Sequence, residues 1–298
     1  MKQSIDYLQQ DHSGEKTNDI CLVLEGGGLR GVFTSGVLEF FLENHIDFPR
    51  VVGVSAGACT GASYISHQIG RNWKVNVEAP SDKRFMGLKH LLRKGSYFNM
   101  EFIFEEVPQT LIPFDEKSFY QNQSDFDVVI TSASTGESVV LSKSEIAGIG
   151  LNKVLRASSS IPLISKPVEI NGQYFYDGGV SDSIPVKYAL AKHKKVVAIL
   201  TRPRGYRKEI SRNPLLYKLI FRKNPAFLNA LVKRNEEYNK TLDYCNKMEK
   251  EGRLYIIAPS AEFPIKRTEH SFEKRANLYN HGYSLIRNEI ENLLQFLK

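Results

Sequence analysis

The feature that most constrains the fold is a pattern that occurs twice near the start of the chain. Ile20–Leu24 (ICLVL) is a continuous apolar run, as expected for a strand that is buried on both faces. It leads into three glycines at 26–28, and apolar residues at helical spacing follow. Residues 51–54 form a second apolar run, which leads into a glycine-bounded turn and a helix of small residues. Strand, helix, strand, helix with short connections predicts a parallel α/β sheet.

The rest of the chain extends this sheet and then changes character. Further short strands are predicted at 126–131, 138–141, 168–170, 173–176 and 195–200. Beyond residue 202, helical patterns cover 214–251 and 271–298, and an apolar run at 253–258 between them is expected to join the main sheet. We therefore expect three parts, which are a polar N-terminal arm (1–18), an α/β core (19–201) and a mostly helical C-terminal extension packed on the core (202–298).

Residues 53–57 (GVSAG) match the pattern G-x-S-x-G between a predicted strand and a predicted helix. A serine on such a sharp turn is strained, and side chains larger than those of Gly53 and Gly57 would collide there. The turn presents Ser55 at the carboxyl edge of the sheet, where open α/β sheets bind ligands. The N–H group of Ala56 begins the helix and can face a developing oxyanion. The pattern predicts a nucleophile, and a serine that only caps the helix is the alternative.

The first turn, GGGLRG at 26–31, is a glycine loop. Its three consecutive glycines, Gly26, Gly27 and Gly28, let backbone N–H groups turn outward and form a nest for an anion. With Gly31 the spacing also fits a dinucleotide fingerprint, which needs an acidic residue about 20 positions further on. Asp47 lies roughly that far along, but it precedes the second strand, and a serine turn is no part of a dinucleotide site. We therefore favour the anion nest.

Asp177 follows the predicted strand 173–176 and precedes Gly178 and Gly179. A carboxylate at the end of a strand, followed by two glycines, can reach an active site with little steric crowding. An ordinary Asp-Gly turn is the alternative for this segment alone.

In this order, GGGLRG, GVSAG and DGG resemble the motifs of the patatin-like phospholipase family, in particular its bacterial branch. The resemblance covers residues 20–200. It implies a three-layer α/β/α fold with a mainly parallel sheet, and a Ser–Asp dyad without histidine that hydrolyses acyl esters of lipids. Ser55 would be the nucleophile and Asp177 its base. N–H groups around Gly27 and Gly28 would form the oxyanion hole, with Arg30 as a basic helper near the loop.

Two other interpretations stay open for the same residues. A conventional triad would take its histidine from those that follow the acid, which are His193, His270 and His281. A lipid- or anion-binding protein could share the fold and have little or no turnover. The sequence shows no cluster of metal ligands, and we expect neither a metal nor another cofactor.

The net charge of +7 is unevenly distributed. Between residues 202 and 223 one Glu accompanies eight cations, which are Arg202, Arg204, Arg207, Lys208, Arg212, Lys218, Arg222 and Lys223. Such a segment attracts phosphates, and peripheral contact with an anionic membrane is one interpretation. A solvated face without a partner is the other. No nucleic-acid motif surrounds the segment, so we expect no nucleic-acid partner.

The remaining composition bears on compartment and on substrate. The three cysteines are far apart and odd in number, which is typical of a reducing compartment. The first residues are polar, without the apolar region of a signal peptide, and no stretch is long enough to span a membrane. We expect a cytoplasmic protein. Five phenylalanines between 85 and 120 suit an acyl pocket or plain core packing equally well: Phe85, Phe98, Phe102, Phe104 and Phe114.

Overall fold

The computed structural model describes residues 19–209 and 214–298, and a single eight-stranded sheet runs through them. The strand order is β5-β6-β3-β2-β1-β7-β8, and β4 pairs with β3 off this path. The five parallel strands are β1 (Ile20–Leu24), β2 (Arg50–Val54), β3 (Asp125–Ser132), β7 (Lys195–Ile199) and β8 (Leu254–Ile257). Antiparallel pairings add β4 (Ser138–Ser142), β5 (Val168–Ile170) and β6 (Gln173–Asp177).

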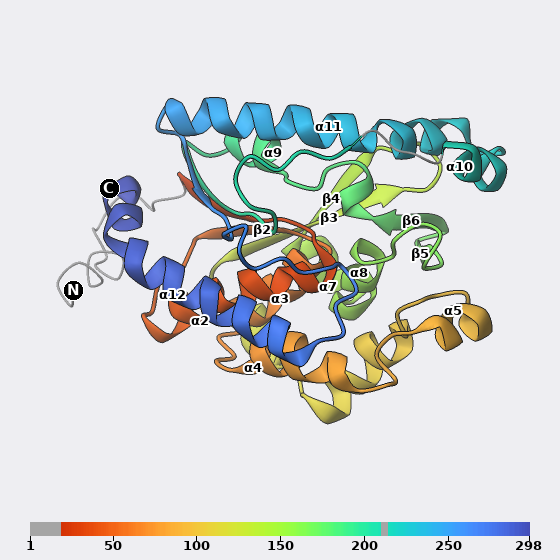
Figure 1. Ribbon diagram of the computed structural model, residues 1–298, viewed down its shortest axis with the longest axis horizontal. Helices are drawn as coiled ribbons and strands as arrows, with labels where there is room; N and C mark the ends of the chain where they lie inside the picture. The colour runs from red at the N-terminus through yellow and green to blue at the C-terminus, as the bar shows by residue number, and fades with distance from the viewer. Residues whose placement is uncertain (1–18, 210–213) are drawn as a thin grey trace.

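Helices cover both faces of this sheet (Figure 1). One face carries α2 (Val32–Glu43), α3 (Ala56–Ile65) and α12 (Phe272–Leu297), and the other carries α9 (Val186–Leu190) and α11 (Pro225–Lys250). The sequence of β1 is apolar throughout because both of its faces are buried. Leu22 and Leu24 pack against the first helical layer, and Cys21 and Val23 pack against the second. The three-layer α/β/α arrangement with a mainly parallel sheet is as predicted.

Shorter helices fill the connections between these elements. Residues 71–121 contain α4 (Arg71–Trp73), α5 (Leu88–Lys94), α6 (Glu116–Gln121) and the wider helical turns Lys74–Glu78 and Phe102–Leu111. Helices α7 (Lys143–Ile149) and α8 (Leu151–Ser158) follow β4. The predicted helix over 214–251 is two helices, α10 (Pro214–Phe221) and α11, because Pro225 begins a new helix whose first turn is capped by the Asn224 side chain.

The C-terminal region shares the sheet and the core with the region before it. Strand β8 pairs in parallel with β7, as expected for the apolar run. Helix α12 lies against α2, and two glycines permit the close approach. A Cβ at Gly36 would lie 2.0 Å from the Tyr279 carbonyl oxygen, and one at Gly282 would lie 2.3 Å from that of Phe33. Any side chain at either position would therefore push these helices apart.

Among the described residues, no helix combines the length and the apolar character that a membrane span requires.

Candidate active site

The register of four strands brings the predicted site residues to one edge of the sheet. Leu24 on β1 lies opposite Gly53, and Val54 on β2 lies opposite Val129 on β3. Strand β6 pairs with the last residues of β3, with Asp177 opposite Ile130. The ends of β1, β2 and β6 therefore place the glycine loop, Ser55 and Asp177 at the same edge of the sheet. Sequence reasoning did not foresee that β6 runs antiparallel to β3, and this direction brings Asp177 toward Ser55.

Ser55 sits on a sharp turn between β2 and α3. Its φ of 54° and ψ of −122° are unusual for a residue with a side chain. The two flanking glycines are required by packing, since a Cβ at Gly53 would lie 2.5 Å from the Ala58 Cα and one at Gly57 would lie 2.4 Å from the Leu24 carbonyl oxygen. The strained turn has the geometry that the sequence predicted for GVSAG.

The Ser55 hydroxyl donates a hydrogen bond to Asp177 Oδ2 at 2.7 Å, and both residues are buried. The backbone of Ser55 is held from a third element, because its N–H group donates to Ser158 Oγ at 2.8 Å. The Ser158 hydroxyl in turn donates to the Val129 carbonyl at 2.7 Å. Sequence reasoning missed Ser158, whose only signal was its place in a serine run at the end of a predicted helix.

Asp177 is fixed on three sides. Its Oδ1 accepts from the Gly179 N–H at 2.7 Å, which leaves Oδ2 for Ser55. Its own N–H donates to the Ser160 carbonyl, and its carbonyl accepts from the Thr131 hydroxyl. A Cβ at Gly178 would lie 2.2 Å from the Val129 carbonyl oxygen, so the DGG sequence is also a packing requirement. The carboxylate therefore meets the serine in one defined orientation.

The glycine loop lies beside this pair. Gly28 has a positive φ of 57°, and no described group accepts a hydrogen bond from the Gly27 N–H. Arg30 is buried, and its Nε donates to the Gly27 carbonyl at 3.1 Å. Burial, with Arg267 and Arg202 nearby, lowers the pKa of Arg30 to about 10. Arg30 thus braces the loop, and Gly31 leaves room for Ala56 at the start of α3.

These residues enclose a narrow pocket of about 10 Å³. Two of the residues that line it were not predicted from the sequence. They are Arg234 from α11 and Arg267 from the loop before α12. Both come from the C-terminal region, which carries no recognisable motif. The pocket is lined by Gly26, Gly27, Gly28, Ser55, Ile161, Asp177, Gly179, Arg234 and Arg267.

The three candidate triad histidines lie outside this pocket. His270 Nε2 lies 3.1 Å from the Tyr97 hydroxyl. His281 Nε2 accepts from the Ser260 N–H at 2.9 Å, and its ring stacks on Phe263. Burial lowers the pKa of His281. His193 lies after α9, and the described pocket walls do not include it. The geometry therefore favours a dyad over a triad.

The structure also locates Asp47 and the side chains that could bind a metal ion. Asp47 precedes β2, so it lies at the opposite edge of the parallel sheet from the glycine loop, and its Oδ1 pairs with His67. This position does not suit a ribose contact at the loop. Among the described residues, no group of three or more His, Cys, Asp or Glu side chains converges in a way that could hold a metal ion.

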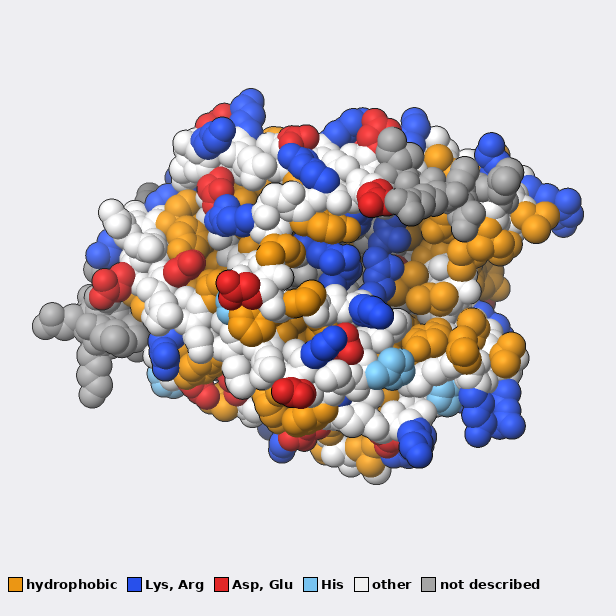
Figure 2. Space-filling model, in the orientation of Figure 1, with side chains coloured by type: hydrophobic (Ala, Val, Ile, Leu, Met, Phe, Trp, Pro, Cys, Tyr) orange, Lys and Arg blue, Asp and Glu red, His pale blue; other side chains and the backbone are white. Residues whose placement is uncertain are grey.

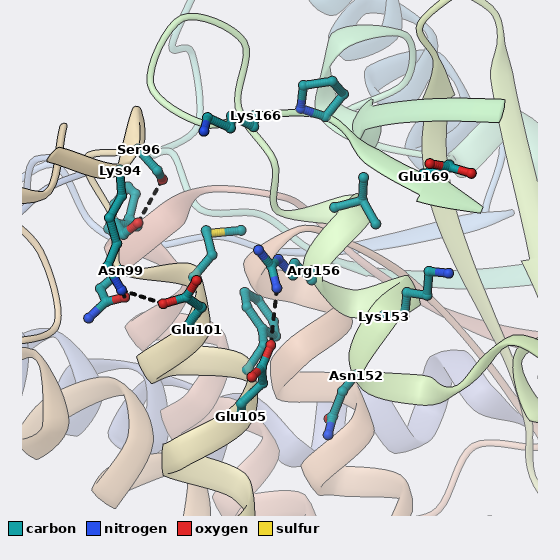
Figure 3. Close-up of a pocket in the computed structure, with 15 residues that line it drawn as sticks. Lys94, Ser96, Asn99, Glu101, Glu105, Asn152, Lys153, Arg156, Lys166 and Glu169 are labelled. Atoms are coloured by element: carbon teal, nitrogen blue, oxygen red, sulfur yellow. Dashed lines mark hydrogen bonds and ion pairs between the residues drawn. The ribbon is translucent and has the colours of Figure 1, made fainter. Parts of the chain in front are cut away.

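A separate cavity of about 740 Å³ does not include Ser55. It opens between the segment 94–105, helix α8 and strand β5 (Figure 3). Phe98 and Phe104 contribute to its wall, while all five phenylalanines expected at an acyl pocket pack in or against the hydrophobic core. Many of its labelled side chains are charged, including the ion pair between Arg156 and Glu105. Such a wall does not suit a buried acyl chain.

The basic segment is not a uniform solvated face. Arg204 forms two hydrogen bonds to the Glu249 carboxylate, and Arg207 pairs with Asp243, both on α11. Lys208 is half-buried, with its ammonium 3.5 Å from the centre of the Tyr238 ring. Arg212 lies outside the described residues.

Two family models match parts of this chain. Residues 22–190 match the family model described as patatin-like phospholipase, and residues 224–298 match a domain of unknown function, DUF6363. The chain is 28% identical over 193 residues to the uncharacterized protein YjjU of Escherichia coli, a match that covers 61% of this chain and 51% of that protein. This chain thus spans about half the length of that relative.

Two further similarities reach more of the chain at lower identity. Over 269 residues it is 24% identical to Lysophospholipase NTE1 of Cryptococcus neoformans, covering 82% of this chain and 15% of that protein. A solved structure of human GIVD cytosolic phospholipase A2 aligns over 99% of this chain and 61% of that chain, with a TM-score of 0.47 and 10% identity.

Proposed function

Because the chain belongs to the patatin-like phospholipase family, we propose that it is a serine acyl-hydrolase acting on carboxylic esters of lipids. The observation that carries the proposal is the 2.7 Å hydrogen bond from Ser55 Oγ to Asp177 Oδ2, two buried residues that line a small pocket together with the glycine loop. A strained serine, an adjacent base and free loop amides are the parts that acyl transfer needs.

Acylation begins when Ser55 Oγ attacks the carbonyl carbon of the ester and Asp177 Oδ2 accepts its proton. The carbonyl oxygen becomes an oxyanion, which the N–H groups of Gly27, Gly28 and Ala56 stabilise. When the tetrahedral intermediate collapses, Asp177 returns the proton to the leaving oxygen. An alcohol departs and the acyl group stays on Ser55.

Deacylation repeats the same steps with water. Asp177 accepts a proton from water as its oxygen attacks the acyl carbon, and the same amides hold the second oxyanion. Collapse releases a fatty acid and returns the proton to Ser55 Oγ. The orientation of Asp177 by the Gly179 N–H supports both steps, since it keeps one carboxylate oxygen directed at the serine.

A fluorophosphonate probe tests the proposal, because its phosphoryl oxygen resembles the oxyanion that the loop amides would bind. We expect one covalent adduct, on Ser55, in the wild-type chain, and none in Ser55→Ala. Peptide mapping by mass spectrometry locates the adduct. Labelling at another residue, in a protein that hydrolyses a chromogenic ester, would contradict this site. A folded chain that neither hydrolyses esters nor reacts would instead support a binding protein without turnover.

We also propose peripheral contact with an anionic bilayer, through α10 rather than through residues 202–209. Helix α10 exposes three large apolar side chains, with exposed fractions of 45% for Leu216, 68% for Leu219 and 52% for Ile220. Lys218 is exposed between them, whereas Arg204 and Arg207 are paired with α11. Helix α5, with its own exposed leucines, lies at the same end of the molecule (Figure 1). Apolar insertion beside a cation is the pattern of interfacial helices.

A further inference from the structure

The C-terminal region forms hydrogen bonds to two loops at the candidate active site. The Arg267 carbonyl accepts from the Leu29 N–H of the glycine loop at 3.0 Å. Arg234 on α11 donates from Nε to the carbonyl of Gly179, in the loop at 177–179 (DGG), at 2.6 Å. Figure 2 shows Lys and Arg side chains gathered in a hollow of this face, below α11. We call residues 177–179 the acid loop.

The contact at Gly179 connects α11 to the carboxylate of Asp177. The Gly179 carbonyl accepts from Arg234 Nε and, at 2.9 Å, from the Ser183 hydroxyl. The Gly179 N–H donates to Asp177 Oδ1 at 2.7 Å, and the other carboxylate oxygen, Oδ2, accepts from Ser55. Gly179 is thus bound through its carbonyl to the arginine and through its N–H to the acid.

After Asp177, the acid loop has no side chain that could fix its own conformation. A Cβ at Gly179 would lie 2.9 Å from Asp177 Oδ1 and 3.6 Å from Arg234 Nη2, so the carboxylate and the guanidinium both approach this position closely. Glycine has more backbone freedom than any other residue, and two in succession do not hold an N–H group in place on their own. The hydrogen bonds to the Gly179 carbonyl therefore supply the constraint that the loop sequence lacks.

Arg234 is held at the pocket without a paired carboxylate. It is half-buried and lines the pocket, and among residues 19–209 and 214–298 it forms no ion pair. Burial and then the charge of Arg267 lower the pKa of Arg234, while the negative charge of Asp177 opposes the shift. Taking an unpaired guanidinium out of water costs free energy, so a purely stabilising role does not account for this position.

We propose that Arg234 is a positioning residue for Asp177, supplied by the region that matches a domain of unknown function. The inference rests on the proposed ester hydrolysis at Ser55. By holding the Gly179 carbonyl, Arg234 keeps the Gly179 N–H on Oδ1 of the acid and leaves Oδ2 directed at the serine. Arg234 acts through Gly179 and not on the substrate, so its loss should lower kcat rather than raise KM.

Steady-state kinetics with a soluble short-chain ester test this role. Arg234→Met keeps much of the bulk of the side chain and the helix propensity of α11, but it removes the donor and the charge. We expect kcat to fall about ten- to a hundred-fold with little change in KM, the size of a small misplacement of reacting groups. Arg234→Lys, which retains a donor, should recover part of kcat. Lys233→Gln is the matched control and should keep the wild-type kcat, because Lys233 is exposed on the same helix.

Chemical rescue separates a lost donor from a loosened fold. Arg234→Ala leaves space for a free guanidinium ion, which can donate to the Gly179 carbonyl in place of the side chain. At concentrations too low to unfold the chain, guanidinium should raise kcat of Arg234→Ala several-fold, the recovery of part of one charged hydrogen bond. It should not raise kcat of Arg234→Met, whose side chain fills the space. An equal response of the two variants contradicts the proposal.

Hydrogen exchange supplies a readout that does not depend on turnover. The amides of residues 178–180 should exchange faster in Arg234→Met than in the wild type or in Lys233→Gln, because the acid loop loses an anchor. Unchanged kcat in Arg234→Met, a higher KM at unchanged kcat, or unchanged exchange overturns the positioning role while ester hydrolysis stands. If the wild type hydrolyses no ester, the function at Ser55 fails. Exchange then decides whether Arg234 anchors the acid loop, and unchanged exchange overturns that as well.

Discussion

Residues 22–190 and residues 224–298 contribute to the same pocket in different ways. The first region supplies Ser55, Asp177 and the glycine loop, each inside a short motif with a local physical reason. The second supplies Arg234 and helix α12, which packs on α2, and neither lies in a short sequence motif. The groups proposed for the chemistry are thus encoded locally. The charge beside them comes from residues that reach the site only when the C-terminal region packs on the core.

This difference predicts how substitutions in the two regions should behave. Changes at the motifs should affect hydrolysis and leave the fold intact, because those side chains are small and lie at one edge of the sheet. Changes in the C-terminal region should affect stability, membrane contact or the positioning of Asp177. The following predictions test this division, beginning with the largest effect.

The first prediction concerns the dyad. Ser55→Ala and Asp177→Asn should each lower kcat/KM for a soluble ester by roughly four orders of magnitude. The two residues act as one unit, so the loss of either one removes most of the enzyme's activity. His281→Ala, in α12, should retain most activity, since His281 contacts Ser260 rather than the pocket. Circular dichroism checks that each variant is folded. A folded His281→Ala without activity would show that the C-terminal region carries chemistry after all.

The second prediction asks whether the two regions unfold together. Gly282→Ala places a methyl group against the Phe33 carbonyl and should lower the free energy of unfolding by about 2 kcal/mol or more. For a chain of this size the melting temperature should fall by roughly 4–8 °C. Gly148→Ala is the control, because nothing lies within 4 Å of its Cβ position and α7 gains a better helix former.

In Gly282→Ala, ester hydrolysis and helical signal should be lost in one transition, since β8 and α12 belong to the sheet and the core. Two separate transitions, with hydrolysis surviving the first, would mean that the C-terminal extension is an independent unit. The predicted division at residue 201 would then be a true domain boundary.

The sequence predicts the region with local signals better than the region without them. Continuous apolar runs identify β1, β2 and β7, and glycine-bounded turns identify Ser55 and Asp177. The antiparallel pairing of β6 with β3 joins segments that are distant along the chain, and no local pattern encodes it. The same holds for Ser158, Arg234 and Arg267, whose neighbours at the site are distant in sequence. Such residues become visible only when the register is known.

The third prediction concerns α10. Replacing Leu219 and Ile220 together with Ser should weaken binding to vesicles of anionic lipid several-fold, because two exposed apolar side chains would no longer insert. Cosedimentation at two salt concentrations measures it. Arg204→Gln with Arg207→Gln is the comparison, and it should change binding little, since both arginines are already paired. If the arginine variant alone loses binding, residues 202–209 form the membrane surface and α10 does not.

The smallest effect is expected at Lys208, where burial and then Arg234 lower the pKa to about 6 from an ordinary 10.5. Between these values the unfolded chain holds a proton that the folded chain lacks, so this group makes stability rise with pH. Below about 6 both states are protonated, and the destabilisation by the buried charge is complete. Lys208→Gln should therefore raise stability at pH 6 by at least about 1 kcal/mol, the value of one pKa unit, and by less at pH 9.

Charged groups around Lys208 decide whether this gain is electrostatic. Arg30, Arg234 and Arg267 disfavour its protonation, and Glu25 favours it. Thermal melts at pH 6 and pH 9 measure the effect, with Lys89→Gln, at an exposed position, as the control. A gap that is independent of pH would mean that Lys208 acts by packing on Tyr238 alone.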